Sequence, residues 1–243
     1  AVDEDGDSVL TILLTVNACS WETLNIVLEA ALKSGLDPNH KNGNSISILM
    51  EFCYNKACAK TIVDAGGDLD AEDAGGKTAL MYAVASDSQG IRHIEYLVEA
   101  GANIDKVDNH GRTALMHAVM RHRARSVECL ISMGANIKAI DNSSWNALSW
   151  AASELFRYRM HIPECETIAR LLVQNGDDEL LRRVPNVCSS YLLKVVFKMF
   201  KETKEAKLHI EDRVDELESR IKRDLPLWCE YAAEEAIAKR QKM

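Results

Sequence analysis

The sequence predicts an all-α fold: a solenoid of about five helix–turn–helix repeats with β-hairpin turns, followed by further C-terminal helices. Two observations support this prediction. A motif with Asp, Gly and Thr at fixed spacing recurs along the chain, and a second motif that contains a glycine recurs between its copies. The glycines of the second motif are 31, 35, 33 and 42 residues apart, at Gly35, Gly66, Gly101, Gly134 and Gly176. A period near 33 residues is typical of solenoids, in which each repeat buries its apolar face against its neighbours.

The first motif is clearest in two copies. Asp73-Ala-Gly-Gly-Lys-Thr-Ala-Leu-Met81 recurs as Asp108-Asn-His-Gly-Arg-Thr-Ala-Leu-Met116, and residues 3–10, 42–49 and 141–148 are weaker copies. Aspartate favours the first position of a tight turn, and a threonine hydroxyl can cap the start of a helix. Apolar residues then follow at helical spacing. We therefore expect each copy to form a hairpin turn that leads into the first helix of a repeat.

The second motif marks the end of the second helix. Leu-Val-Glu-Ala-Gly-Ala-Asn-Ile-Asp over residues 97–105 recurs over residues 130–137, with earlier copies at 62–70 and 32–39. Gly101 and Gly134 come directly after apolar helical segments, where the chain commonly needs a left-handed residue. We expect positive φ angles at both glycines.

Together the two motifs resemble the D-x-x-G-x-T-P-L-H and L-L-x-x-G-A-D-x-N signatures of the ankyrin repeat family. The resemblance covers about residues 3–177 and implies an ankyrin-repeat domain over residues 1–177. The proline and the histidine of T-P-L-H are absent, because Ala79, Ala114 and Ala147 replace the one and Met81, Met116 and Ser149 the other. The hydroxyl–imidazole bonds of the family are then missing, and we expect the repeats to depend more on packing.

Family members usually meet protein partners at the hairpin tips and the exposed face of each first helix. Carried over by position, the resemblance implies a partner-binding surface on the concave side. Its residues are Lys77, Val107, Asn109, His110, Arg112, Met120, Arg121, Asn142, Trp145 and Glu154, and Ala74 and Ser143 also belong to it. Trp145 has two interpretations, as an exposed binding anchor or as a ring packed on the next hairpin. The basic segment 121–125 is either a solvated loop or a receptor for an acidic peptide or phosphate.

The sequence indicates a binding protein rather than an enzyme, and we expect no catalytic residue, metal site or cofactor. It contains no G-x-S-x-G or H-E-x-x-H motif. Gly76-Lys-Thr78 matches the end of a phosphate-binding loop, but Ala71 stands where the first glycine is required. His117 and Cys129 are expected to pack in the core. The seven cysteines have no CxxC spacing, which favours reduced thiols in a cytoplasmic or nuclear protein.

The charge distribution argues against binding nucleic acid. The net charge is −8, and residues 1–75 hold 4 Lys+Arg against 13 Asp+Glu, whereas nucleic-acid binding requires a basic surface. No apolar run approaches the roughly 18 residues that span a bilayer, and the acidic first residues do not fit a secretory signal. We expect a protein partner and no membrane span.

Residues 178–243 are predicted to form a helical cap and a charged helical tail. An apolar stripe within residues 206–225 is about two heptads long, short of the three or four that argue for a stable coiled coil. The tail therefore either folds back on the repeats or allows self-association. It leaves two alternative functions open: an assembly subunit docked through its C-terminal helices, and a regulatory fragment of a larger enzyme or channel.

Overall fold

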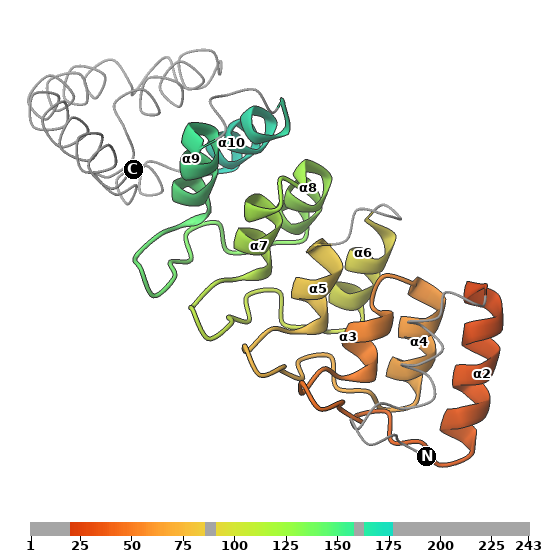
Figure 1. Ribbon diagram of the computed structural model, residues 1–243. Coiled ribbons are helices and arrows are strands. Elements are labelled where there is room, and N and C mark those ends of the chain that lie inside the picture. The colour runs from red at the N-terminus through yellow and green to blue at the C-terminus, as the bar shows by residue number, and fades with distance from the viewer. Residues whose placement is uncertain (1–19, 86–90, 158–162, 177–243) are drawn as a thin grey trace, which may run out of the picture.

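The computed structural model describes residues 20–85, 91–157 and 163–176 (Figure 1). Helix α2 (Trp21–Lys33) is the second helix of repeat one, and a pair of helices forms each later repeat. The pairs are α3 (Ile48–Phe52) with α4 (Lys56–Asp64), α5 (Ala79–Ala85) with α6 (Arg92–Glu99), α7 (Ala114–Met120) with α8 (Ala124–Ser132), and α9 (Ala147–Arg157) with α10 (Pro163–Asn175). The predicted hairpin at residues 3–10, the tail domain 178–243 and its stripe at 206–225 lie outside the described residues.

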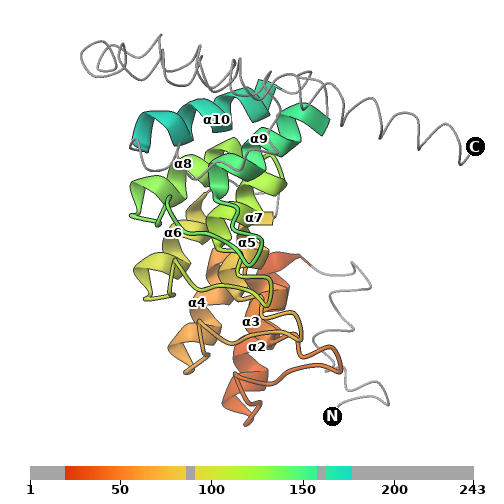
Figure 2. The same cartoon turned by 90° about the vertical axis from the view of Figure 1, so that its left-hand side faces the viewer.

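The helix pairs stack in chain order along one axis. The first helices α3, α5, α7 and α9 contact one another in succession, as do the second helices α2, α4, α6, α8 and α10. Figure 2 shows these two layers from the side, with the hairpin loops projecting beyond the first helices. The predicted all-α repeat solenoid is therefore confirmed.

The apolar core repeats with the sequence motif. The leucine seven residues after the start of each hairpin motif is almost fully buried, and a large apolar residue of each second helix meets it. These core residues include Leu49, Leu80, Leu115 and Leu148 from the first helices and Ile62, Leu97, Leu130 and Leu172 from the second. A single helix pair could not bury both sets, so each repeat depends on its neighbours for its hydrophobic stabilisation.

Side-chain caps begin the first helices, and left-handed glycines follow the second ones. The hydroxyls of Ser47 and Thr113 accept the backbone N–H groups of the third residue of α3 and α7. Gly101 and Gly134 have φ angles of 107° and 90°, as predicted. These caps satisfy backbone groups that the short helices leave unpaired.

The hairpins contain less β-structure than the prediction of β-hairpin turns suggested. Within the described residues the antiparallel pairing consists of isolated bridges, Lys41 with Ser47 and Val107 with Thr113. A tight turn inside each hairpin replaces longer strands, because the backbone N–H of Gly111 donates to the carbonyl of Asp108 at 2.8 Å. The same bond closes the turn around Gly76, so Gly76-Lys-Thr78 is part of a repeat hairpin.

Candidate functional site: the hairpins and first helices

An aspartate organises each hairpin of repeats three to five. We call this residue position 0, which is Asp73, Asp108 and Asp141, with Asn42 as its counterpart in repeat two. The Oδ1 atom of Asp108 accepts the backbone N–H groups at positions +2 and +4, at 2.8 and 2.9 Å. Asp73 and Asp141 accept the same two groups in their own hairpins. The side chains at positions +2 and +4 are thereby held on a closed turn.

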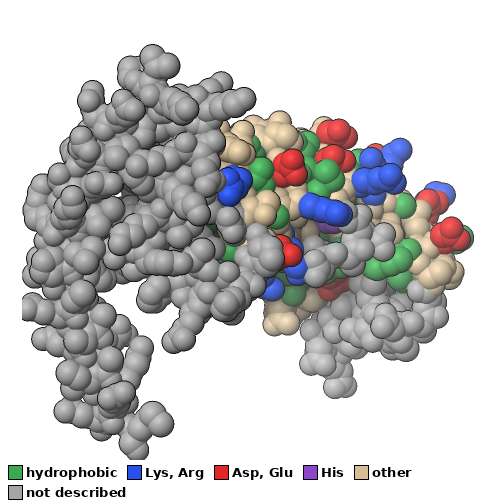
Figure 3. All heavy atoms as spheres, turned by 90° about the horizontal axis from the view of Figure 1, so that it is seen from above, with side chains coloured by type: hydrophobic (Ala, Val, Ile, Leu, Met, Phe, Trp, Pro, Cys, Tyr) green, Lys and Arg blue, Asp and Glu red, His purple; other side chains and the backbone are tan. Residues whose placement is uncertain are grey.

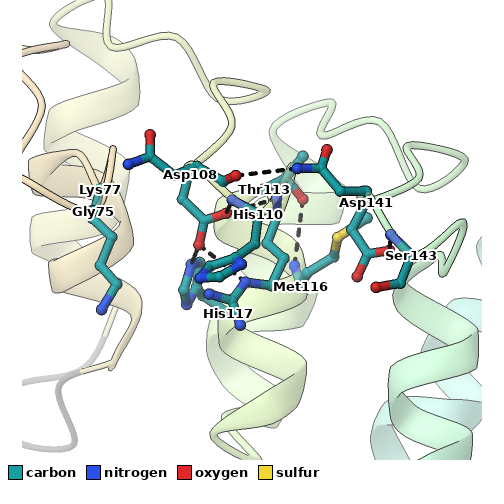
Figure 4. A network of polar contacts seen from close by, with 12 residues as sticks. Gly75, Lys77, Asp108, His110, Thr113, Met116, His117, Asp141 and Ser143 are labelled. Carbon is teal, nitrogen blue, oxygen red and sulfur yellow. Dashed lines mark hydrogen bonds and ion pairs between the residues drawn. The ribbon is translucent and has the colours of Figure 1, made fainter.

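The second carboxylate oxygen binds the first helix of the same repeat. In each case the partner is the side chain at position +9, although three different residue types provide it. Tyr82 Oη lies 2.8 Å from Asp73 Oδ2, His117 Nε2 lies 2.9 Å from Asp108 Oδ2, and Trp150 Nε1 lies 3.0 Å from Asp141 Oδ2. Figure 4 shows this arrangement around Asp108.

Repeat two makes the same connection with the polarity reversed. Asn42 at position 0 carries an amide, and Glu51 at position +9 accepts a hydrogen bond from its Nδ2 atom at 3.2 Å. The Oδ1 atom of Asn42 still accepts the N–H groups at positions +2 and +4. An acceptor at position 0 therefore goes with a donor at +9, and a donor at position 0 goes with an acceptor.

These contacts supply a polar connection that the sequence analysis did not predict when it expected more dependence on packing. The residues missed are those at position +9. Their signal was a constant spacing of nine residues from the turn aspartate to a side chain with a hydrogen-bond donor. The signal was hard to recognise because a phenol, an imidazole and an indole share no other property.

Asp108 is the most strongly bound of the three aspartates. Its side chain is fully buried and also accepts a charge-assisted hydrogen bond from Arg112 Nε at 3.0 Å. Burial by itself would raise the pKa of Asp108, but the hydrogen bonds from Arg112, His110 and His117 outweigh it and lower the pKa below its usual value. Asp108 is thus a structural carboxylate that stays ionised.

His117 is a packing residue, as predicted. Its side chain is largely buried, and burial lowers its pKa; the bond to Asp108 opposes this effect, while the nearby charges of Arg112 and Lys77 add to it. Within the part of the chain that the structure describes, no serine, threonine or cysteine side chain hydrogen-bonds to His117. The imidazole therefore holds the hairpin against α7.

Two predicted site residues, Asn109 and Asn142, tie successive hairpins together. The backbone N–H and Nδ2 groups of Asn109 donate to carbonyls of Gly75 and Ala74 in the previous hairpin, at 3.0 and 3.1 Å. Asn142 repeats both bonds with the hairpin of repeat four. Their side chains remain exposed, but their amide N–H groups are used within the solenoid.

The other predicted residues lie on the hairpins and on or beside the first helices of repeats three to five. Lys77, Arg112 and Trp145 occupy position +4 of three successive hairpins and are half-buried, whereas His110 at position +2 is exposed. Val107, just before position 0, has 46 % of its surface exposed. Met120 ends α7 and Arg121 follows it, exposed. Glu154 lies on α9, and its side chain is outside the described set.

Trp145 fits neither of its two predicted environments completely. Its ring lies against Trp150 of its own repeat, with ring centroids 4.9 Å apart and an interplanar angle of 56°. Such tilted aromatic pairs are favourable beyond the area that they bury. The Trp145 ring is half-buried, so the two tryptophans form a partly exposed aromatic pair at the last described hairpin.

The remaining reactive groups of the described residues are in the core. Cys53, Cys58, Cys129 and Cys165 are free and buried, and burial raises the pKa of Cys58 and Cys129 to about 11. Cys165 Sγ lies 3.1 Å from His122 Nδ1 and so connects α10 to the loop after α7. The described residues contain no cluster of three or more potential metal ligands. None of the helices formed by these residues is long and apolar enough to cross a membrane.

Known protein families show the same repeat. A family model described as "Ankyrin repeats (3 copies)" matches residues 15–108 and, in a second match, residues 88–182. The two matches together cover more than half of the 243 residues. The chain belongs to the ankyrin repeat family.

A solved structure agrees with this assignment at the level of the fold. The ankyrin repeat chain is similar to the crystal structure of the ankyrin repeat domain of Bcl-3, described as a unique member of the IkappaB protein family. The two have a TM-score of 0.63 and 23 % sequence identity, over 83 % of this chain and 85 % of the Bcl-3 chain. No curated protein matches the sequence.

Proposed function

We propose that this protein is an adaptor or scaffold that binds a protein partner through the hairpins and first helices of repeats three to five. Membership of the ankyrin repeat family supports a protein-interaction module. One observation carries the choice of surface. Lys77, Arg112 and Trp145 occupy the same position on three successive hairpins, and the position 0 aspartate holds each of those turns closed.

The rigidity of these turns favours binding. The aspartate and the first helix already fix the backbone at position +4. A bound partner would therefore restrict only the motion of the side-chain ends. Preorganised surfaces lose less conformational entropy on association. Tryptophan and arginine are also the residue types most enriched among binding hot spots. We call Lys77, His110, Arg112, Arg121 and Trp145 the binding face.

The proposal includes no catalytic activity, because the buried polar groups of the hairpins already serve the fold. We also propose a cytoplasmic or nuclear location, which the four free, buried cysteines support. The alternatives of C-terminal docking and of a regulatory fragment depend on residues 178–243, which lie outside the described residues, so no contact described above favours them.

The test is a comparison of partners captured by three forms of the full chain. The forms are the natural sequence, a binding-face variant with Lys77→Ala, His110→Ala and Trp145→Ala, and a control variant with Glu29→Ala, Lys60→Ala and Glu99→Ala. The control positions are exposed and lie on the second helices α2, α4 and α6. Quantitative mass spectrometry of the bound proteins measures which partners each form retains.

We expect the binding-face variant to lose the main partner and the control variant to keep it. Circular dichroism checks that both variants stay folded, which is expected because none of the six side chains hydrogen-bonds to a hairpin aspartate. If the partner instead stays with the binding-face variant and is lost with the control variant, the interface lies on the second helices and the proposal is wrong.

A further inference from the structure

The hairpin side of repeats three to five has an asymmetric distribution of hydrogen-bonding groups. Its acceptors point inward: both oxygens of each position 0 aspartate are bound, Oδ1 by two backbone N–H groups and Oδ2 by the side chain at position +9. A carboxylate with all these bonds has little capacity left for a ligand. The negative charges of the three position 0 aspartates are therefore not offered to a partner.

Most side-chain donors of the binding face are not used within the solenoid. The side chains of Lys77, His110, Arg121 and Trp145 make no hydrogen bond or ion pair with any residue that the structure describes. Arg112 uses its Nε atom on Asp108 at 3.0 Å, and no hydrogen bond to a described residue engages the two terminal nitrogens of its guanidinium, whose side chain is 19 % exposed. Figure 4 shows Lys77 on the preceding hairpin, beside this network. A partner thus meets donors, of which three belong to cations.

Repeat spacing sets the length of the complementary segment. Neighbouring packed helices lie about 8–10 Å apart, so the three residues at position +4 extend over about 20 Å. An extended chain advances about 3.3 Å per residue, so about three residues of a bound segment correspond to one repeat. The row presents two cations, at Lys77 and Arg112, and then the Trp145–Trp150 pair.

We infer that the partner of this surface presents an extended acidic segment with carboxylates about three residues apart, opposite Lys77 and Arg112, and a large apolar or aromatic side chain against Trp145 and Trp150. The inference rests on the proposed function and names the chemistry of its partner. Carboxylates suit the donors because charge-assisted hydrogen bonds are stronger than neutral ones. Guanidinium groups bind carboxylates with particularly good geometry.

The charge of the whole chain favours an acidic protein segment over a nucleic acid. The net charge is −8, and acidic side chains such as Glu72 and Asp105 are exposed on the same hairpins. Figure 3 shows acidic and basic side chains interspersed over another face of the described residues. A phosphate backbone would meet these carboxylates along its length, whereas a short acidic segment can be confined to the row of donors.

Fluorescein-labelled twelve-residue peptides test the inference with the full-length protein. The acidic probe carries two glutamates three residues apart and a phenylalanine three residues further on, in a background of serine and glycine; a second probe has the reverse order. Matched probes replace the glutamates by glutamine or by lysine, and a twenty-nucleotide oligothymidylate represents polyanions. Fluorescence anisotropy at about 50 and 200 mM salt gives each dissociation constant.

Charge reversal on the protein locates the binding site of the acidic probe. The face variant is Lys77→Glu with Arg121→Glu, and Arg112 is left unchanged because it binds Asp108. The matched control is Lys33→Glu with Lys60→Glu, which changes the net charge equally at exposed positions of α2 and α4. A third variant, Trp145→Ala, removes the proposed aromatic contact.

We expect the acidic probe to bind at least ten-fold more tightly than its glutamine analogue, with weaker binding at higher salt. The face variant and Trp145→Ala should each weaken it about ten-fold or more, and the control pair by less than two-fold. If the glutamine or lysine probe binds equally well and still requires Trp145, the inference about acidic partners is wrong but the proposed face remains. If neither Trp145→Ala nor the face variant changes the dissociation constant, or if no probe binds, the proposed face is wrong as well. Equal binding of the oligonucleotide would show a general polyanion site and overturn the inference.

Discussion

The hairpin tips of repeats three to five are joined differently from those of repeats two and three. Between the later repeats, Asn109 and Asn142 at position +1 bind the carbonyls of the preceding tip. Repeat three has Ala74 at this position, so the side-chain bond is not available to it. Repeat two is instead connected by Lys41, whose exposed ammonium donates to the carbonyl of Glu72 at 2.8 Å.

The residue at position +3 also differs between these two sets of hairpins. A Cβ atom on Gly111 would lie 2.5 Å from Asn142 Oδ1 and 2.8 Å from its backbone nitrogen, and Gly76 is equally close to Asn109. Ser45 has the same left-handed conformation, with a φ angle of 61°, and the next tip carries Ala74. The close approach of the following repeat's asparagine therefore requires glycine, whereas the turn alone accepts serine, as at Ser45 and Ser144. The glycine of the family's turn motif thus reflects a contact between neighbouring repeats.

The largest expected effect comes from removing the ionised side chain at position 0 of repeat four, compared with the neutral side chain at position 0 of repeat two. Asp108→Ala removes a buried acceptor of four hydrogen bonds and leaves Arg112 and His117 without it. We expect a loss of about 3 kcal/mol or more in the free energy of unfolding, measured by urea denaturation. Asn42→Ala removes a neutral acceptor of two backbone N–H groups and the amide donor to Glu51, and it should cost about half as much. Equal losses would mean that the charge of Asp108 adds nothing to the later repeats.

The next prediction separates crowding from backbone conformation. Gly111→Ala and Gly134→Ala both place a Cβ atom at a positive φ angle, but nothing lies within 4 Å of the Cβ position at Gly134. Gly134→Ala should cost about 1–2 kcal/mol from the left-handed conformation. Gly111→Ala should cost about 1–3 kcal/mol more, because the hairpin of repeat five must move away. Thermal unfolding of the two variants measures the difference, and its absence would contradict the requirement for close approach.

The third prediction concerns the pH dependence of the later repeats. The pKa values of Asp108 and His117 are lowered in the folded protein, so both groups bind their protons more tightly in the unfolded chain. Acidification therefore favours unfolding. We expect the urea midpoint to fall as the pH drops below about 6.5, where an unfolded histidine titrates, and further below about 4. Since burial also lowers the pKa of His93, His117→Gln should reduce the first decrease without abolishing it; an unchanged profile would count against this role of His117.

The smallest effect should come from rebuilding the junction of repeats two and three. Ser45→Gly removes a non-glycine residue from the left-handed region, and Ala74→Asn supplies the side chain that ties the later tips. We expect the double variant to gain about 1 kcal/mol, more than the sum of the single variants, because the glycine makes room for the asparagine. Differential scanning calorimetry of the four forms measures this coupling. Strict additivity would show that glycine and asparagine act independently.

Most of the repeat fold could be predicted from particular residues. Gly101 and Gly134 marked the ends of the second helices, and Thr113 marked the start of α7, because caps depend on local backbone conformation. The candidate surface was predicted by position, and the structure puts Lys77, Arg112 and Trp145 at equivalent places. The contact of Trp145 with Trp150 could not be chosen in advance. The side chain at position +4 can turn toward its own helix or the next hairpin, and the sequence does not distinguish these directions.

The sequence by itself determined the period, the order of helices and turns, and the burial of one leucine in each hairpin motif, because these features follow from short-range preferences repeated along the chain. Tertiary structure decided which polar groups are used inside the solenoid and which remain for a partner. Asn109 was predicted as a binding residue, but its side-chain amide donates to the preceding hairpin. Tyr82, His117 and Trp150 hydrogen-bond to the turn aspartates. The physical reason is that a hydrogen bond requires two groups within about 3 Å. Across repeats that proximity arises only when the helices stack.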